Sequence, residues 1–269
     1  MLELLQFPFV QRAIISGLIL GLLFAVLGVY VILRNMAFWG DGIAHASLAG
    51  IAFALFSGSQ PLLWAIIVSV AFAVTIFFLE RHTTLSNDAL IGVLFTSFMA
   101  LGVVILSFIP GYQPELISFL FGNILTVGVV DILIMSVVGS LILIFVYFNN
   151  RALALQTFDR ESAYLAGINT DALDLLFYIS LAVSVVLGVK VLGVVLVSAL
   201  LIIPASIAKM VSRSYKSLRI VSVIIGEVVV IVGMMTSLWW DIPSGPSIIL
   251  VGAILFLCAG IFKASHIQK

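Results

Sequence analysis

Charged side chains are the scarcest feature of this sequence. Only 9% of its 269 residues are charged, whereas 63% are hydrophobic. Because soluble domains carry roughly 25% charged residues, this scarcity excludes an ordinary soluble domain. The chain has as many acidic as basic residues, 12 of each, so its net charge gives no indication of a nucleic-acid partner.

Two further absences restrict the possible functions. The chain has a single cysteine, Cys258, which excludes an internal disulfide, and its apolar neighbours predict a small buried side chain. The chain also lacks the G-x-x-x-x-G-K-[ST] phosphate-binding loop, so it cannot hydrolyse ATP by itself. No segment between the apolar runs is long enough for a catalytic domain. We therefore expect a protein that is not an enzyme and that is driven by an ion gradient or by another polypeptide.

Apolar runs of about 20 residues recur along the whole chain, which is typical of a polytopic α-helical membrane protein. We predict an all-α transmembrane bundle, a single domain over residues 1–269. The nine predicted spans are 10–33, 40–57, 61–80, 88–109, 127–148, 171–189, 191–208, 219–238 and 246–262. Another apolar piece, 117–125, is too short to cross and is predicted to form a re-entrant or surface helix.

Basic residues predict how the chain is oriented. Most of the 12 Lys and Arg residues fall on alternate loops and on the C-terminal tail: Arg34, Arg81, Arg151, Arg160, Lys209, Arg213, Lys216, Arg219, Lys263 and Lys269. Only Arg12 and Lys190 lie on the opposite side. The positive-inside rule therefore predicts an N-terminus outside the membrane and a C-terminus in the cytoplasm.

Asp41 and His45 are unusual because they interrupt an otherwise apolar region, "LRNMAFWGDGIAHASLAG" (33–50). If the helical rise is counted from Arg34, they lie about 10 Å and about 16 Å into a hydrocarbon core about 30 Å thick. An ionised Asp there costs roughly 2.5–3.5 kcal/mol, so it should face protein or a water-filled path. Spacing i, i+4 puts both side chains on one helix face, where they could bind a divalent metal such as zinc or manganese. The alternative is an Asp–His pair that satisfies itself between packed helices.

Small residues next to this pair predict tight helix packing. Gly42, Ala46, Gly50 and Ala54 repeat every four residues, a pattern that lets helix backbones approach closely. Two protein ligands are too few for a transport site. A two-fold dimer would supply two Asp and two His side chains around one axis, which is enough for a four-ligand site.

The stretch "NMAFWGDGIAHASLAG" resembles the second-helix motif of the membrane permeases of ABC-type zinc and manganese importers. Four more stretches agree with that family in the expected order over roughly residues 8–262: "NDALIGVLF", "ISFLFGN", "VKVLGVVLVSALLIIPASIA" and "WWDIPSGPSIIL". The resemblance implies a homodimeric permease in a bacterial cell membrane. Such a permease receives its metal from an extracytoplasmic binding protein and is driven by two cytoplasmic ATPase subunits.

In that family the Asp and His of this helix handle the transported metal, and they correspond here to Asp41 and His45. The resemblance implies transported zinc or manganese and no permanently bound cofactor. "DGIAHASL", with Ser47, looks closer to the zinc-type members, while manganese and iron stay open as substrates.

The cytoplasmic segment at about 153–168 is the best candidate for docking an ATPase. It combines an apolar face with a charged rim, as a modest protein interface requires. Its candidate contact residues are Phe158, Asp159, Arg160, Glu161, Tyr164, Leu165 and Ile168. Gly167 is a plausible helix stop, and the segment resembles the coupling helix of the same family, with Gly167 at its glycine position. The alternative is an ordinary amphipathic loop.

Three further residues are secondary candidates. Pro204 should kink the seventh span, as a hinge for alternating access or as a static packing feature. Asp241, in the external turn "DIPSGPS", could contact a binding protein or metal, or belong to a plain structured loop. Glu227 lies about 12 Å into the eighth span, where a hydrogen bond to a neighbouring helix is favoured over metal contact.

Two other functional classes follow from the same residues. A secondary cation transporter would use Asp41, His45 and Glu227 as a proton-linked relay. An intramembrane metalloenzyme is disfavoured, because the sequence has no H-E-x-x-H motif and only 3 histidines.

Overall fold

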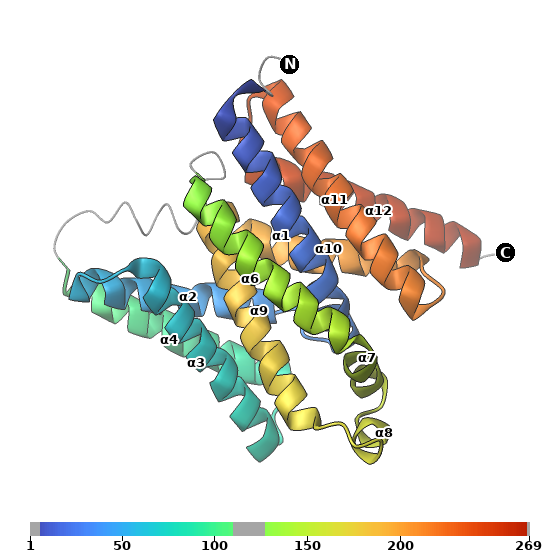
Figure 1. The fold of residues 1–269 in the computed structure, drawn as a ribbon, viewed down its shortest axis with the longest axis horizontal. Coiled ribbons are helices and arrows are strands. Elements are labelled where there is room, and N and C mark those ends of the chain that lie inside the picture. Colours follow the sequence, from blue (N-terminus) through green and yellow to red (C-terminus); the bar gives the residue numbers. More distant parts are fainter. Residues whose placement is uncertain (1–5, 110–126, 268–269) are drawn as a thin grey trace.

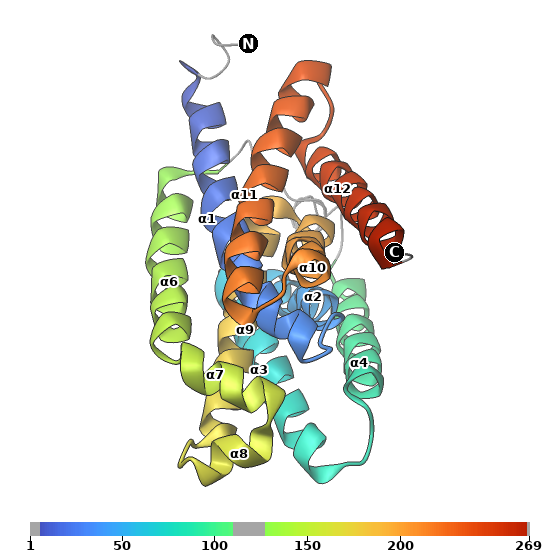
Figure 2. The same ribbon diagram turned by 90° about the vertical axis from the view of Figure 1, so that its right-hand side faces the viewer.

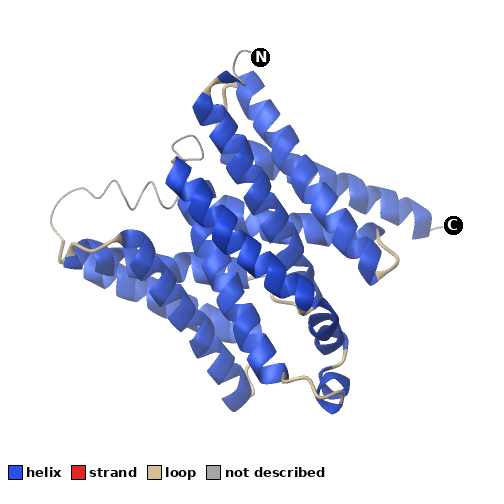
Figure 3. Ribbon diagram, in the orientation of Figure 1, coloured by secondary structure: helices blue, strands red, loops and turns tan. Residues whose placement is uncertain are grey.

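The computed structural model describes residues 6–109 and 127–267, and in these ranges the chain is built from helices joined by turns (Figure 3). Nine of the described helices are long and apolar enough to cross a membrane. They are α1 (Pro8–Leu33), α2 (Trp39–Ser57), α3 (Pro61–His82), α4 (Asn87–Ser107), α6 (Val129–Phe148), α9 (Thr170–Leu192), α10 (Val194–Val211), α11 (Tyr215–Trp240) and α12 (Ser244–Ile267). Each corresponds to a predicted span, which confirms the all-α fold. The helix predicted at 117–125 lies outside the described residues.

Local sequence signals set where these helices begin and end. Pro8 and Pro61 start α1 and α3, where a missing N–H costs no hydrogen bond. Ser86 caps α4 by accepting a hydrogen bond from the backbone N–H of Ala89. Gly58 ends α2 in the left-handed conformation.

The helices pack as two groups around α9 (Figure 1). In one group α2 packs against both α3 and α4; in the other, α1, α10 and α11 pack together and α12 covers α10 and α11. Helix α9 contacts α2 and α3 on one side and α1 and α10 on the other. The short helices α7 (Asn150–Phe158) and α8 (Arg160–Leu165) lie at the end of the molecule far from the N-terminus (Figure 2).

Glycines allow the closest helix crossings. A Cβ atom added at Gly50 would lie 2.4 Å from the backbone oxygen of Trp64 on α3, and one at Gly28 would lie 2.0 Å from that of Leu201 on α10. Neither position can carry a side chain unless a backbone moves. The small-residue stripe on α2 therefore packs as predicted, with Gly50 facing α3 and Gly42 facing both α3 and α4.

The outward faces of α4, α6 and α12 remain apolar and exposed, as expected of helices that meet lipid. Cys258 lies on such a face of α12 and is exposed. The prediction that it is buried is wrong, because α12 packs on α10 and α11 with only part of its circumference.

The connection between α1 and α2 differs from the sequence-based expectation. Residues 34–38 form a turn, Asn35 has a left-handed φ of 56°, and α2 begins only at Trp39. Helical rise cannot be counted from Arg34, because the chain does not continue along one helix axis from there. The depths of Asp41 and His45 in the membrane stay a prediction.

Candidate functional site

Asp41 lies in the first turn of α2, where the positive end of the helix dipole favours a carboxylate. The Ser198 hydroxyl, on α10, donates a hydrogen bond to Oδ1 of Asp41. Asp41 is partly exposed, whereas Ser198 is buried. The carboxylate is thus held where the start of α2 meets α10, with its second oxygen left for another partner.

His45 follows one helical turn later on α2. Its Nδ1 lies 2.9 Å from the backbone oxygen of Asp41. Because a carbonyl oxygen can only accept, Nδ1 carries the hydrogen, and in the neutral ring the lone pair is on Nε2. The imidazole ring packs perpendicular to the ring of Phe95 of α4, with ring centroids 4.9 Å apart. Metal-binding histidines commonly donate one ring N–H to a carbonyl oxygen and bind the metal through the other nitrogen, and His45 has this arrangement with Nε2 available.

These two residues do not complete a metal centre within one chain. Among the described residues there is no group of three or more His, Cys, Asp and Glu side chains that could hold a metal ion. Asp41 and His45 are both partly exposed on the same helix, so another molecule or water could reach them and supply further ligands. Their assignment to metal handling stays a prediction.

Ser198 is a site residue that sequence reasoning missed. It is a hydroxyl within the apolar run that forms α10, and it lies in one of the stretches that resemble metal permeases. A polar side chain in an apolar run is the sequence signal that could have identified Ser198. Its partner could not be inferred, because Ser198 and Asp41 are 157 positions apart.

The segment predicted to dock an ATPase folds into α7 and α8, and Gly167 follows with a φ of +80°. This confirms the helical pattern and the glycine stop. Phe158, Tyr164 and Leu165 are 66%, 71% and 84% exposed, whereas Ile168 packs partly against the core. The apolar face is therefore available to a partner, although docking itself stays a prediction.

Charged residues border this apolar face. Asp159 begins α8, and its carboxylate accepts hydrogen bonds from the hydroxyl and the backbone N–H of Ser162. These hydrogen bonds, the hydroxyl first, lower the pKa of Asp159 below its usual value. Arg160 and Glu161 are exposed beside it, so the arrangement matches an apolar patch with a charged rim.

The secondary candidates lie in different places. Pro204 is buried inside α10. Asp241 ends α11 with a left-handed φ of 53° and is exposed. Glu227 is partly buried on α11 beside Gly21 of α1, and its carboxylate has no hydrogen-bond partner among the described residues. No metal-binding group unites Glu227 with Asp41 and His45 within the described ranges.

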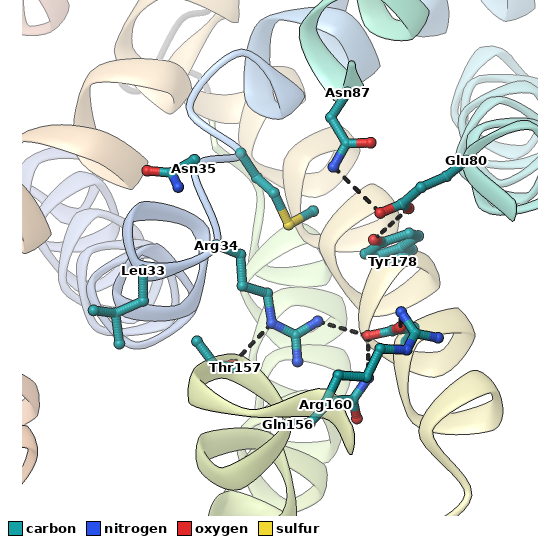
Figure 4. Close-up of a pocket in the computed structure, with 11 residues that line it drawn as sticks. Leu33, Arg34, Asn35, Glu80, Asn87, Gln156, Thr157, Arg160 and Tyr178 are labelled. Atoms are coloured by element: carbon teal, nitrogen blue, oxygen red, sulfur yellow. Dashed lines mark hydrogen bonds and ion pairs between the residues drawn. The ribbon is translucent and has the colours of Figure 1, made fainter. Parts of the chain in front are cut away.

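A polar cavity of about 280 Å³ lies between the turn that precedes α2 and helices α7, α8 and α9 (Figure 4). It is lined by Leu33, Arg34, Asn35, Met36, Glu80, Asn87, Gln156, Thr157, Arg160, Asp174 and Tyr178. Sequence reasoning did not identify this cavity, because its lining residues come from distant parts of the chain.

Comparison with known proteins agrees with the resemblance seen in the sequence. The model of the ABC 3 transport family matches residues 6–263. A relative named as the high-affinity zinc uptake system membrane protein ZnuB of Haemophilus influenzae is 30% identical over 97% of this chain and 100% of its own length. The manganese transport system membrane protein MntC of Halalkalibacterium halodurans is 32% identical over 97% of this chain and 89% of its own length.

A solved structure has the same fold. PsaBC from Streptococcus pneumoniae, in complex with Fab, matches with a TM-score of 0.83 and 30% identity, covering 95% of this chain and 92% of that chain.

Proposed function

Because this chain belongs to the ABC 3 transport family, we propose that it is the permease subunit of an ATP-driven importer of divalent transition-metal ions, with zinc as its substrate. It is a multi-pass membrane protein whose relatives are metal-transport permeases, which are not enzymes themselves. The named relatives transport either zinc or manganese. Membership of the family thus supports metal transport in general. Zinc as the substrate is a more specific proposal, which the names of the relatives do not decide.

The observation that carries the proposal is the Asp41–His45 pair at the start of α2. One carboxylate oxygen and one imidazole nitrogen remain for a ligand, and this donor set suits a borderline divalent ion such as zinc or manganese. Two ligands from one chain are too few for a transport site, so a second chain must supply the others. The complete site should still bind only transiently, because the ion must leave again.

The complete importer needs three partners. A second copy of this chain would bring its own Asp41 and His45 to the two-fold axis. Cytoplasmic ATP-binding subunits would dock on the exposed apolar residues of α7 and α8, and an extracytoplasmic metal-binding protein would deliver the ion. The N-terminus would then lie outside and the C-terminus in the cytoplasm of a bacterial cell membrane.

Substrate choice is tested by metal accumulation in cells with and without this chain, measured for zinc, manganese and iron. We expect chain-dependent accumulation of zinc above that of the other two. Accumulation of manganese or iron alone would support the proposal that the chain belongs to a metal importer, but it would show that zinc is not the substrate. Accumulation that stops when the proton gradient collapses, while ATP is maintained, would favour the secondary cation transporter.

The site is tested with Asp41→Ala and His45→Ala. We expect either change to reduce uptake to the level of cells lacking the chain, while the protein still purifies as a dimer with its ATPase. His82→Ala is the matched control, because Nδ1 of His82 makes the same local contact, 2.7 Å from the backbone oxygen of Phe78, away from the site. Normal uptake by both site variants would exclude the proposed site.

A further inference from the structure

Asp174 of α9 is a nearly inaccessible carboxylate with four donors around it. Its side chain is 4% exposed. The donors come from four other helices or their ends: Arg34 Nη1 at 2.7 Å, Gln156 Nε2 at 2.6 Å, Arg160 Nη1 at 3.1 Å and Arg81 Nη2 at 3.2 Å. Arg34, Gln156 and Arg160 converge here beside the polar cavity (Figure 4). One side chain thus ties together segments from both halves of the chain.

The charges in this cluster make Asp174 difficult to replace. Arg81 and Arg160 also bind the exposed Asp171, so three guanidinium groups share two carboxylates and positive charge is in excess by one. Loss of one partner of a buried ion pair leaves the other charges uncompensated. Asp174 therefore holds mutually repelling arginines from different helices in one place.

Arg34 links the cluster to the segment proposed to dock the ATPase. Its Nε donates to Thr157 of α7 at 3.0 Å, while its Nη1 binds Asp174. Gln156 of α7 and Arg160 of α8 bind the same carboxylate. A displacement of α7 and α8 would therefore act on Arg34 both directly and through Asp174.

Arg34 also ends α1 and opens the turn that leads to α2. The far end of that turn is held by α9 too, because Trp39 packs on Tyr178 with ring centroids 4.2 Å apart. Tyr178 is one helical turn beyond Asp174, so both contacts come from one face of α9. Between them, Asn35 adopts a left-handed φ of 56°, a conformation that asparagine adopts more readily than most other non-glycine residues.

From these contacts we propose that Asp174 is a positioning residue, which passes a displacement of α7 and α8 through Arg34 and the 34–38 turn to Asp41 at the start of α2. The inference rests on the proposed function as a permease. It goes beyond that function by assigning the link between the docking segment and the metal-handling helix to one buried carboxylate.

The test is Asp174→Asn in the complete transporter, reconstituted in vesicles with its ATPase and metal-binding protein. The amide keeps the shape of the side chain and removes the charge that holds the three arginines. We expect ATP hydrolysis to continue while the amount of zinc transported per ATP falls about fivefold or more, the lower end of typical coupling between sites. Zinc binding by the permease should be unchanged, because Asp174 does not contact Asp41 or His45.

Asp131→Asn is the matched control. Asp131 binds Lys190 and accepts a hydrogen bond from the Gly128 backbone at 3.1 Å, but it has no contact with Arg34 or with α7 and α8. We expect an unchanged transport-to-ATP ratio. If Asp174→Asn does not fold, Arg34→Gln replaces it, because that change leaves two guanidinium groups and two carboxylates, with equal positive and negative charge. It should also lower the ratio.

The outcomes separate this inference from the proposed function. If the unaltered complex moves no zinc, manganese or iron in response to ATP, the permease function itself fails. If the unaltered complex transports metal and Asp174→Asn or Arg34→Gln keeps the same transport-to-ATP ratio, the positioning role is excluded. A fall in ATP hydrolysis by the same factor as the fall in transport would also overturn the positioning role.

Discussion

His45 and His82 make the same local hydrogen bond but have different surroundings. In each residue Nδ1 contacts the backbone oxygen four positions earlier, which belongs to Asp41 and Phe78 respectively. His82 is exposed at the end of α3, whereas His45 is partly buried within α2 against Phe95. The local motif therefore fixes the ring in both cases, and only its place in the fold makes His45 a candidate ligand.

The hydrogen bond from Ser198 to Asp41 leads to a prediction for Ser198→Ala. The change removes the side-chain donor that holds the Asp41 carboxylate at α10. Because partners of metal ligands typically contribute 10- to 100-fold to affinity or activity, we expect zinc uptake at limiting zinc to fall about tenfold. Uptake rates measured over a range of zinc concentrations would test this.

Ser69→Ala is the control for that experiment. Ser69 is a buried serine of α3 whose hydroxyl reaches the backbone of α2 at Ile43, 3.5 Å away, without touching Asp41. We expect uptake close to that of the unaltered protein. Equal losses in both variants would mean that Ser198 supports helix packing and does not act through Asp41.

At the scale of helices, the residues next to each helix end explain which helix boundaries could be predicted from the sequence. Proline at the first position of α1 and α3 and glycine after α2 and α8 act through backbone geometry alone, so the sequence indicates them directly. The turn at 34–38 carries a weaker signal, because asparagine and not glycine occupies its left-handed position and no proline marks it. That turn determines where α2 starts.

Helix α8 presents its apolar residues outward, which leads to a prediction for Leu165→Asp. Leu165 is 84% exposed at the end of α8 and lines a surface groove with Tyr164 and Arg160. A carboxylate in the centre of an apolar contact would be desolvated without a partner. We expect the ATPase recovered with the purified permease to fall about tenfold, as for a typical hot-spot residue.

Leu85→Asp is the matched control for Leu165→Asp. Leu85 is also an exposed leucine, at 56%, and it lies in the connection between α3 and α4. We expect normal recovery of the ATPase with this variant. Equal loss from both variants would contradict docking on α8.

At the scale of the whole molecule, the spans were predictable and their contacts were not. Hydropathy alone locates nine membrane-length helices, because each must be apolar to lie in lipid. The Asp174 cluster joins residues 34, 81, 156 and 160 to one carboxylate. Such partners are far apart in sequence and are brought together only by the packing of α9 between the two helix groups.

The orientation of the molecule is a prediction that its single cysteine makes testable. With Cys258→Ser as the background, one cysteine is introduced at an exposed position at each end: Leu165→Cys in α8 and Ser59→Cys between α2 and α3. Because basic residues predict that α8 faces the cytoplasm, a membrane-impermeant maleimide added to intact cells should label Ser59→Cys and not Leu165→Cys.

Permeabilised cells provide the control, because both cysteines should then be labelled if both side chains are accessible. In sealed inside-out vesicles the pattern should reverse, with Leu165→Cys reacting first. Labelling of Leu165→Cys in intact cells would place α7, α8 and the Asp174 cluster outside. A cytoplasmic ATPase could not reach them there, so that single result would contradict both the orientation and the proposed route from ATP hydrolysis to Asp41.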